Sequence, residues 1–427
     1  MAHARAEAKT AYTRLVRRLN RHPQGAPPSQ ALYAILKMLF GEREASLAAL
    51  LPLKPFTAEK AARIWKMNVD DARQVLDGLA GRAVLLDIEG RRRTYYVLPP
   101  PMAGFFEFAL MRLRGDIDQK LLSKLYHQYV TIEPEFGTAL FSGETKPGRA
   151  FVHEPAIEPD DALHVLDYER ASEVIKTARH RSIGLCYCRH KARHAAHACA
   201  APLDICMTFG STASSLARHG YARAVDAAEG MDLLRLAYEH NLVQFGENVR
   251  QGVNFICNCC GCCCEAMIAA RRFAILRPVH TTNFLPEPRA TTCTGCGECV
   301  SVCPVEAMTL VSANDPRHPR KKTAKLDGDV CLGCAICVRA CKTKSLILKS
   351  RPGRVITPLN AAHRVVVMAI ERGKLQDLIF DNRALASHRA MAAILGNIFR
   401  LPPVKRTMAS RQMKSRYLET VINRMKL

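Results

Sequence analysis

The hydrophobic positions near the N-terminal end follow a helical period first and a strand period afterwards. Apolar residues recur every three to four positions in three stretches, then give way to two shorter stretches rich in β-branched and aromatic residues. Thr57 and Asn68 stand where the N-caps of the second and third helices are expected. The pattern predicts helices over residues 29–40, 57–66 and 69–79 and strands over 83–88 and 94–98. This order predicts a winged-helix-like domain over residues 29–101, closed by consecutive prolines.

The turn between the two predicted strands carries arginines at residues 91–93, and such a wing can contact DNA phosphates. The third helix would then enter a major groove. Against this, that helix carries acidic residues, which repel phosphate, namely Asp70, Asp71 and Asp77. Arg73 is its one candidate for reading bases. We therefore favour a structural or protein-docking use of this domain and keep nucleic acid as a disfavoured partner.

The middle of the chain first predicts a helical linker region over residues 102–180. Its helices are expected over residues 104–114, 119–129 and 160–180. Residues 181–275 then alternate short apolar strands with amphipathic helices, which predicts a small α/β domain. The whole chain is thus expected to be an α+β multidomain protein.

Two of the predicted strands in that α/β domain run directly into cysteines. Strand 182–185 leads into Cys186, and strand 253–256 leads into Cys257. If these strands are parallel neighbours, their carboxyl ends meet at one edge of the sheet. Open α/β sheets bind ligands at that edge, so we expect a metal site there.

Cysteine content changes the picture from a generic globular protein to a metal protein. The chain has 18 cysteines among 427 residues. It contains no apolar run of about 18 residues and no signal-peptide pattern near its start, so we expect a cytoplasmic protein. In that compartment many cysteines indicate bound metal rather than disulfides.

Eight of the cysteines form two runs with the spacing C-x2-C-x2-C-x3-C, and Pro304 follows the first run. This spacing is typical of bacterial ferredoxins, in which the fourth cysteine of each run ligates the other cluster. It predicts two 4Fe–4S clusters in a domain over residues 284–350. The expected ligand sets are Cys293, Cys296, Cys299 and Cys341 for one cluster, and Cys331, Cys334, Cys337 and Cys303 for the other. Structural zinc is disfavoured, because it usually takes two C-x2-C pairs separated by a longer stretch.

The segment resembles the two-cluster bacterial ferredoxins, and the resemblance implies transfer of single electrons. It departs from them at Lys342, where the second run usually has proline. Its linker between the two runs is also longer, and we expect a hairpin there between residues 308–311 and 324–326.

The other ten cysteines lie in the predicted α/β domain, and six of them fall within residues 257–264. Soft thiolates select iron–sulfur clusters, zinc or copper(I). We predict a third iron–sulfur centre that shares Cys186 or Cys188 with the 257–264 run. The candidate ligands are Cys186, Cys188, Cys199, Cys206, Cys257, Cys259, Cys260 and Cys263. Zinc, a mixed site with His190, His194 and His197, and free structural cysteines remain open alternatives.

A wider resemblance covers roughly residues 30–350. The segments C-x-C-R at 186–189, C-M-T-F-G at 206–210 and C-N-C-C-G-C-C-C at 257–264 precede the ferredoxin-type pair. This arrangement is similar to a group of cytoplasmic 4Fe–4S dicluster proteins of anaerobic bacteria and archaea. The resemblance implies iron–sulfur binding and electron transfer. Cys259-Cys260-Gly261 also resembles the cysteine–cysteine–glycine modules of heterodisulfide reductases, but three residues are too few to imply that activity.

Charge bears on the partners. The formal net charge is +23, and Lys and Arg far outnumber Asp and Glu in residues 351–427. We expect that segment to be a basic helical extension, with helices over residues 361–377, 384–399 and 410–425. Such a surface favours an acidic redox partner or an oxidoreductase complex, and it also permits peripheral contact with a membrane.

The pattern as a whole predicts an iron–sulfur electron-transfer protein, either a carrier or a subunit of a cytoplasmic oxidoreductase. One alternative is a redox-sensing winged-helix regulator that binds DNA. Another is a thiol or disulfide reductase acting at residues 186–264, although no nucleotide-binding fingerprint accompanies it. The sequence assigns no catalytic residue, so whether the chain is itself an enzyme stays open.

Overall fold

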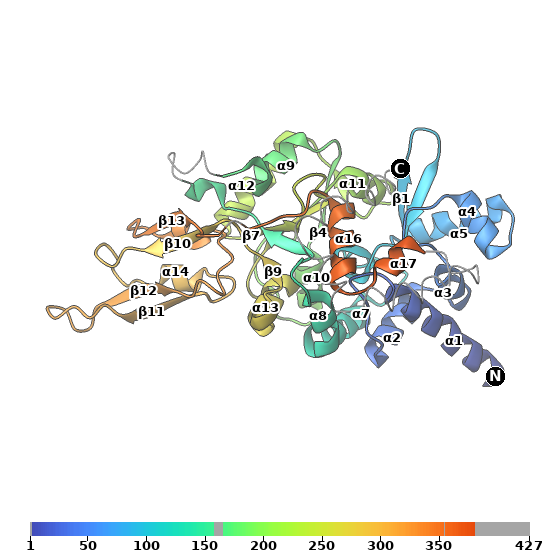
Figure 1. Ribbon diagram of the computed structural model, residues 1–427, viewed down its shortest axis with the longest axis horizontal. Helices are drawn as coiled ribbons and strands as arrows, with labels where there is room; N and C mark the ends of the chain where they lie inside the picture. The colour runs from blue at the N-terminus through green and yellow to red at the C-terminus, as the bar shows by residue number, and fades with distance from the viewer. Residues whose placement is uncertain (1, 158–164, 354, 381–427) are drawn as a thin grey trace. The chain divides into compact units, whose positions relative to one another are not determined.

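The computed structural model describes residues 2–157, 165–353 and 355–380, with side chains from residue 11 onward (Figure 1). Within these ranges no helix is long and apolar enough to cross a membrane. The described residues form two compact units. The first contains the chain up to Thr145, Ser211–Arg223 and the residues from Asn360 onward, and the second contains Lys146–Gly210 and Ala224–Leu359.

The first unit is mainly helical and carries one hairpin. Its helices are α1 (Ala2–Leu19), α2 (Gln30–Leu39), α3 (Glu42–Ala48), α4 (Ala58–Trp65), α5 (Val69–Gly81), η1 (Pro101–Phe105), α6 (Phe106–Phe108), α7 (Gln119–Tyr126), η2 (His127–Ile132), α8 (Pro134–Phe141), α11 (Gly210–Arg218), α16 (Ala361–Glu371) and α17 (Leu375–Ile379). Strands β1 (Leu86–Glu89) and β2 (Thr94–Val97) pair antiparallel, with Leu86 opposite Val97.

Capping side chains set the starts of the three helices predicted before this hairpin. Ser29, Thr57 and Asn68 each accept a hydrogen bond from a backbone N–H in the first turn of α2, α4 and α5, respectively. The predicted helices and strands of this stretch are confirmed to within a few residues. Helices α1, α3 and α8 were not predicted.

Three predicted helices are wrong in length. In residues 104–114 the end of η1 leads into the single turn of α6, and turns follow; the non-helical backbone angles of Met102, Ala103 and Gly104 delay the start of the helix. In residues 160–180 the described helix is α9 (Ala171–Thr177), after a 3-10 turn at Asp167–Glu169. Residues 361–377 split into α16 and α17 around Gly373, whose φ is 63°. The helices predicted over 384–399 and 410–425 lie outside the described residues.

Buried polar contacts fix the base of the hairpin within the first unit. The side chain of Asp87 in β1 accepts hydrogen bonds from Ser215 (2.5 Å) and from Arg218 of α11, and it lies 3.1 Å from His219. Burial raises the pKa of Asp87, but these contacts outweigh burial and the pKa is lowered overall. The hairpin is therefore anchored to α11 through a buried carboxylate.

The second unit is built on a seven-stranded mixed sheet with the order β6-β4-β5-β8-β7-β3-β9. Its strands are β3 (Gly148–Ala150), β4 (Arg181–Leu185), β5 (Asp204–Phe209), β6 (Arg223–Ala224), β7 (Val243–Glu247), β8 (Phe255–Cys259) and β9 (Val279–His280). Its helices are α9, α10 (Tyr187–His194), α12 (Ala227–Glu239) and α13 (Glu265–Arg272), with 3-10 turns at Glu154–Ala156, Asp167–Glu169 and Ala274–Leu276. A core with Ile175, Ile183, Met207, Leu234 and Ile256 joins α9 and α12 to the sheet.

The sheet differs from the expected small α/β sheet because most of its neighbouring strands are antiparallel. β5 lies between β4 and β8 and runs antiparallel to both, so β4 and β8 are not neighbours. Two strands that are each antiparallel to a third run in the same direction. The carboxyl ends of β4 and β8 therefore still lie at one edge of the sheet, and this edge is where the cysteines that end or follow these strands were expected to meet.

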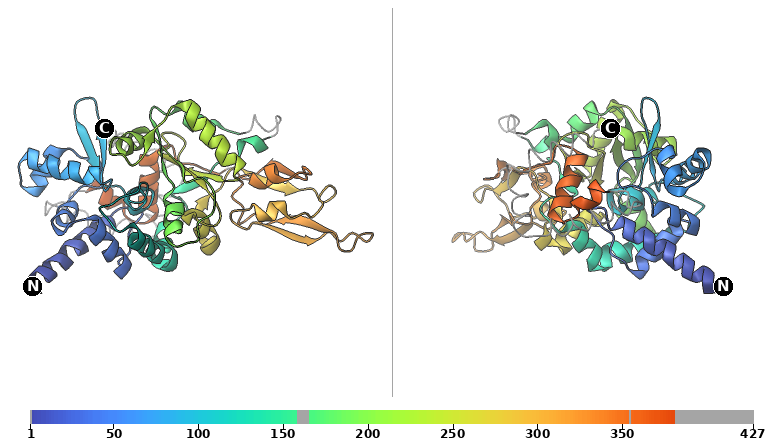
Figure 2. Two further views of the ribbon diagram at one scale, coloured as in Figure 1. Left: turned by 180° about the vertical axis from the view of Figure 1, so that it is seen from behind. Right: turned by 45° about the vertical axis from the view of Figure 1, so that its right-hand side comes forward.

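The remaining part of the second unit contains two antiparallel ribbons and two short helices. β10 (Phe284–Pro288) pairs with β13 (Leu346–Ser350), and β11 (Met308–Ser312) pairs with β12 (Lys322–Leu326). The latter ribbon confirms the predicted hairpin. The helices are α14 (Glu298–Ser301) and α15 (Ile336–Ala340), and Figures 1 and 2 show α14 between the two ribbons.

Candidate metal centres

The two cysteine runs fold as matching loops, each leading into a short helix. Gly295 and Gly333 occupy equivalent places in the two loops and have φ values of 71° and 70°. A Cβ on Gly333 would lie 2.1 Å from the carbonyl oxygen of Phe284, and one on Gly295 would lie 2.5 Å from that of Lys322. Both positions therefore require glycine, because the backbone of a neighbouring strand approaches too closely for a side chain.

Each predicted quartet lines one cavity. The first holds roughly 350 Å³ of empty space, part of it open to solvent, and the second roughly 320 Å³. Apolar side chains such as Leu310 and Ile336 complete their walls. The thiols at the first cavity are Cys293, Cys296, Cys299 and Cys341, and those at the second are Cys303, Cys331, Cys334 and Cys337. The fourth cysteine of each run thus crosses to the cavity of the other run.

The surroundings of these thiols fit iron–sulfur clusters. Backbone N–H groups donate to sulfur at 3.2 Å on Cys303, 3.3 Å on Cys331 and 3.2 Å on Cys341. Such donors stabilise thiolate and cluster sulfur. Burial raises the pKa of Cys331 to about 11 and that of Cys334 to about 12. Burial therefore disfavours the thiolate form of these two residues, and the positive charge of a bound metal would favour it.

Six further thiols form a closed ring at the edge of the large sheet, which we call the six-thiol ring. Each thiol contacts the next, and the Sγ atoms of Cys259 and Cys264 are 3.0 Å apart. In order around the ring the members are Cys186, Cys188, Cys264, Cys259, Cys257 and Cys206. The ring brings together the two cysteine groups that the sequence separates.

Strand register explains the ring. Gly184 pairs with Cys206, and Met207 pairs with Ile256, so Cys206 lies beside both the end of β4 and Cys257. Cys257 and Cys259 are two residues apart in β8 and therefore share one face of the sheet. The remaining members stand at helix starts: Cys186 is the N-cap of α10, Cys188 lies in its first turn, and Cys264 is the N-cap of α13.

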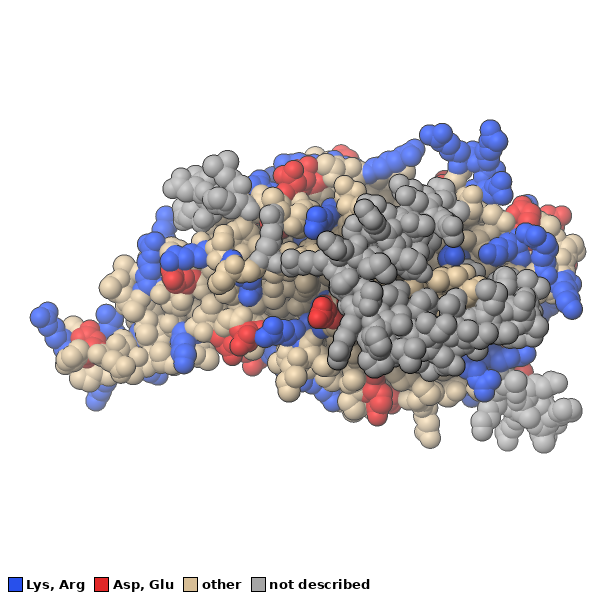
Figure 3. Space-filling view, in the orientation of Figure 1, with Lys and Arg blue, Asp and Glu red and all other residues tan. Residues whose placement is uncertain are grey.

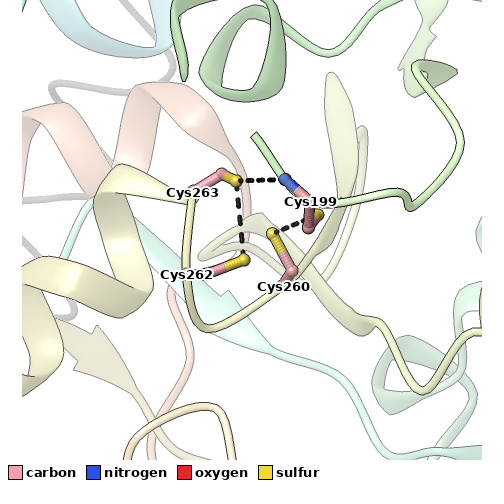
Figure 4. A group of neighbouring side chains, drawn as sticks. All are labelled: Cys199, Cys260, Cys262 and Cys263. Carbon is pink, nitrogen blue, oxygen red and sulfur yellow. Dashed lines mark hydrogen bonds between the residues drawn. The ribbon is translucent and has the colours of Figure 1, made fainter. Parts of the chain in front are cut away.

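The other four thiols of this region form a separate set, which we call the four-thiol group: Cys199, Cys260, Cys262 and Cys263 (Figure 4). Their Sγ atoms all lie within 4.8 Å of one another. Cys199 and Cys260 are 3.6 Å apart, and Cys262 and Cys263 are 3.5 Å apart. Cys199 comes from the loop after α10, and the other three come from the turn between β8 and α13.

Two buried cations lie beside both sets of thiols. Arg189 donates to the carbonyl oxygens of Pro202 (2.9 Å) and Asn258 (2.8 Å), and Lys191 forms an ion pair with Glu265. Burial lowers the pKa of Arg189, but negative charge on Cys186 and other nearby thiolates outweighs burial and raises it overall. Burial lowers the pKa of Lys191, and thiolates of both sets oppose that effect. Such cations balance the negative charge of a thiolate-bound metal centre.

Each set also contains a thiol with a low pKa. A hydrogen bond from Cys206 lowers the pKa of Cys257 to about 6, and one from Cys263 lowers that of Cys260 to about 5. Thiolates are the form that binds metal, so in each set a neighbouring thiol favours the metal-binding form of one ligand.

Two members of these sets were absent from the predicted ligands, namely Cys262 and Cys264. Both belong to the dense cysteine run, but the sequence could not show which side of the turn each one faces. The histidines of the alternative mixed site are not part of either set: the His190 ring lies against that of His194 in a tilted arrangement, with ring centroids 5.0 Å apart, and His197 is exposed. Within the part of the chain that the structure describes, the four-thiol group is the set of possible metal ligands that lie within 4.8 Å of one another, and it contains only cysteines.

Comparison with protein families gives one match, the 4Fe-4S dicluster domain, over residues 292–345. Comparisons with curated proteins and with solved structures found no match. Residues 292–345 therefore form a 4Fe–4S dicluster domain of the ferredoxin type, beside a cysteine-rich region able to hold a further centre. The resemblance of residues 30–350 to proteins of anaerobes stays a prediction.

Proposed function

We propose that this protein is an iron–sulfur electron-transfer protein, acting as a carrier or as a subunit of an oxidoreductase. The observation that carries the proposal is that each cysteine quartet of the dicluster domain lines its own cavity. Cubane clusters bound there would supply one-electron chemistry. The protein's contribution is to hold the eight thiolates, donate N–H groups to sulfur and surround the clusters with partly apolar walls.

The six-thiol ring is proposed as the site of a further iron–sulfur centre. A single tetrahedral ion takes four thiolates, so six contacting thiols exceed what one ion can use. Five of the six are buried, and soft thiolate ligands in such surroundings favour iron–sulfur clusters. This assignment draws ligands from both cysteine groups and includes Cys186 and Cys188.

The cysteine-rich turn touches the dicluster domain directly. Arg271 of α13 donates to the carbonyl oxygen of Pro304 at 2.6 Å, and a Cβ on Gly261 would lie 3.0 Å from Pro304. Pro304 follows Cys303, which lines the second cavity. We propose that this contact connects the ring centre with the dicluster domain and gives electrons a continuous path through packed protein.

An acidic redox protein is the partner that the surface of the dicluster domain fits best. The loop joining β11 and β12 exposes Arg317 and Arg320, Lys322 at the start of β12 is exposed as well, and Figure 3 shows basic groups at the tip of this ribbon. Leu310 and Ala324 of the same ribbon line the first cavity. A partner that docks on this basic loop would therefore stand near the first cluster. A cytoplasmic setting is part of the same proposal.

The proposal is tested by purifying the full chain without oxygen and titrating it with a low-potential reductant. We expect acid-labile sulfide, paramagnetic resonance signals of reduced 4Fe–4S clusters, and electron transfer to an acidic ferredoxin or flavodoxin that weakens as salt rises. A protein that binds zinc in the dicluster domain and no sulfide, even after anaerobic reconstitution, would contradict it.

A further inference from the structure

We propose that the four-thiol group binds a single tetrahedral metal ion, Zn²⁺ or mononuclear iron, independently of the six-thiol ring. This site goes beyond the electron-transfer centres proposed above. It divides the cysteine-rich region into a centre for several metal atoms and a centre for one.

Sulfur spacing distinguishes the two kinds of site. With a Zn–S bond of about 2.3 Å, the ligands of a tetrahedral ion lie about 3.8 Å apart. The four Sγ atoms here lie within 4.8 Å of one another, with contacts of 3.5 and 3.6 Å. A cubane holds its four thiolates on four different irons, which places their sulfur atoms farther apart than the ligands of one ion. The group therefore has the size of a mononuclear site.

The dicluster domain provides an internal comparison. Among the described residues, its eight cysteines form no comparably tight group, and instead surround cavities of roughly 350 and 320 Å³. The same chain thus presents thiols in two spacings. The wide spacing belongs to the domain matched as a 4Fe–4S dicluster domain, and the mutual spacing within 4.8 Å belongs to the four-thiol group. Thiols of the six-thiol ring also touch, with Cys259 and Cys264 3.0 Å apart, but they touch in turn around the ring and, among the described residues, form no such mutual group.

The local backbone separates the four-thiol group from the ring. Consecutive residues of extended chain point to opposite sides. Cys259 ends strand β8 and joins the ring, while the next residue, Cys260, joins the four-thiol group. At the other end of the turn, Cys263 joins the four-thiol group while Cys264, which has extended backbone angles, joins the ring. Six cysteines in eight residues can therefore serve two sites but not one.

A single ion at this place would fix the turn that carries both sites. It would tie residues 260–263 to Cys199, whose loop is also held by the hydrogen bond from Arg189 to Pro202. The same turn packs against Pro304 through Gly261. The chemical class of the ligand is a borderline-soft ion that accepts four thiolates, and its role is structural.

The test measures zinc, iron and acid-labile sulfide in the anaerobically reconstituted full chain and in two matched double variants. Cys199→Ser/Cys262→Ser should lose one zinc, or one iron without sulfide, and keep all sulfide. The control Cys186→Ser/Cys188→Ser should lose iron together with sulfide and keep that single ion. Zinc and iron analysis of the first variant decides which ion is bound.

X-ray absorption on the unmutated protein tests the same point without a variant that might misfold. For zinc, the expected spectrum shows four sulfur neighbours at about 2.3 Å and no nearby metal atom. Loss of about four irons with their sulfide from Cys199→Ser/Cys262→Ser would show a cubane and overturn the proposal. Loss of no metal from a variant that keeps its dicluster signals would overturn it as well. Neither result bears on the dicluster domain, so failure here is distinguishable from failure of the proposed electron-transfer function.

Discussion

The two units of this molecule differ completely in cysteine content. All 18 cysteines lie in the second unit, and the first has none. The first unit is held by helix caps, an apolar core and polar contacts such as that of Asp87 with Ser215. In the second unit many buried positions are thiols, which the proposed metal centres would join to one another. We therefore expect the units to depend on metal to very different degrees, although one chain passes back and forth between them.

Metal removal should separate the units most strongly. When the full chain is stripped of metal under anaerobic conditions, we expect amides around residues 186–264 and 293–341 to lose protection from hydrogen exchange. Amides of α2, α4 and α5 should stay protected, because no cysteine contributes to their packing. Equal loss of protection in both units would show that the first unit depends on the metal centres too.

Ligand variants should separate the two cysteine regions of the second unit. Cys186→Ser/Cys188→Ser is expected to remove the signal of the six-thiol ring and leave both dicluster signals. The reciprocal variant Cys334→Ser should lose about four irons of the dicluster domain and leave the ring intact. Paramagnetic resonance with iron analysis checks both. If the first variant kept every signal and its full iron, the ring cysteines would be structural.

The glycines of the dicluster loops provide a finer comparison. Gly333→Ala should disrupt the second cavity, because its Cβ would lie 2.1 Å from the carbonyl oxygen of Phe284. Gly297→Ala is the matched control: its φ is 85°, but the nearest atom to its Cβ is 3.6 Å away. Ala335 already stands at the equivalent place with a φ of 67°. We expect the cluster to be lost in the first variant and kept in the second. Loss in both variants would mean that the positive φ, and not the contact of the added Cβ, makes glycine necessary at these positions.

Asp87 tests the account of the first unit. Asp87→Ala removes the acceptor of Ser215 and Arg218 and should lower the free energy of unfolding by about 2 kcal/mol, a value reduced for the partial exposure of Arg218. Glu89→Ala removes an exposed ion pair of the same Arg218 and should cost less than about 1 kcal/mol. Chemical denaturation followed by circular dichroism measures both. Equal losses of unfolding free energy in the two variants would show that the buried carboxylate of Asp87 stabilises the unit no more than an exposed ion pair does.

The smallest effect is expected at the wing. Arg91, Arg92 and Arg93 are exposed, but α5 presents the acidic Asp70, Asp71 and Asp77. We expect the unmutated protein to bind DNA only weakly, in a salt-sensitive way and without sequence preference. Replacing the three arginines by Ala should therefore abolish no sequence-specific complex. Selection from genomic DNA that returned one motif, dependent on these arginines, would favour the regulator alternative instead.

Local patterns predicted much of the structure, and topology accounts for the rest. The spacing of the two cysteine runs was enough to assign Cys341 to the first cavity and Cys303 to the second. In this motif the fourth cysteine of each run lies at the cluster of the other run. The N-caps Thr57 and Asn68 likewise located the starts of α4 and α5, because a cap acts within one helical turn. The ring could not be assembled from spacing, since it depends on β5 lying between β4 and β8 and on the register that sets Cys206 beside Cys257. The four-thiol group was missed because it depends on the direction of each side chain in one turn.

The stoichiometry of the anaerobically purified chain tests the central claim most directly. Two cubanes require about eight irons. We predict about eight irons with equal sulfide in the dicluster domain, additional iron and sulfide from the six-thiol ring, and one further ion without sulfide. A reproducible value near eight irons, with matching sulfide and no zinc, would contradict the claim that the ten other cysteines hold metal.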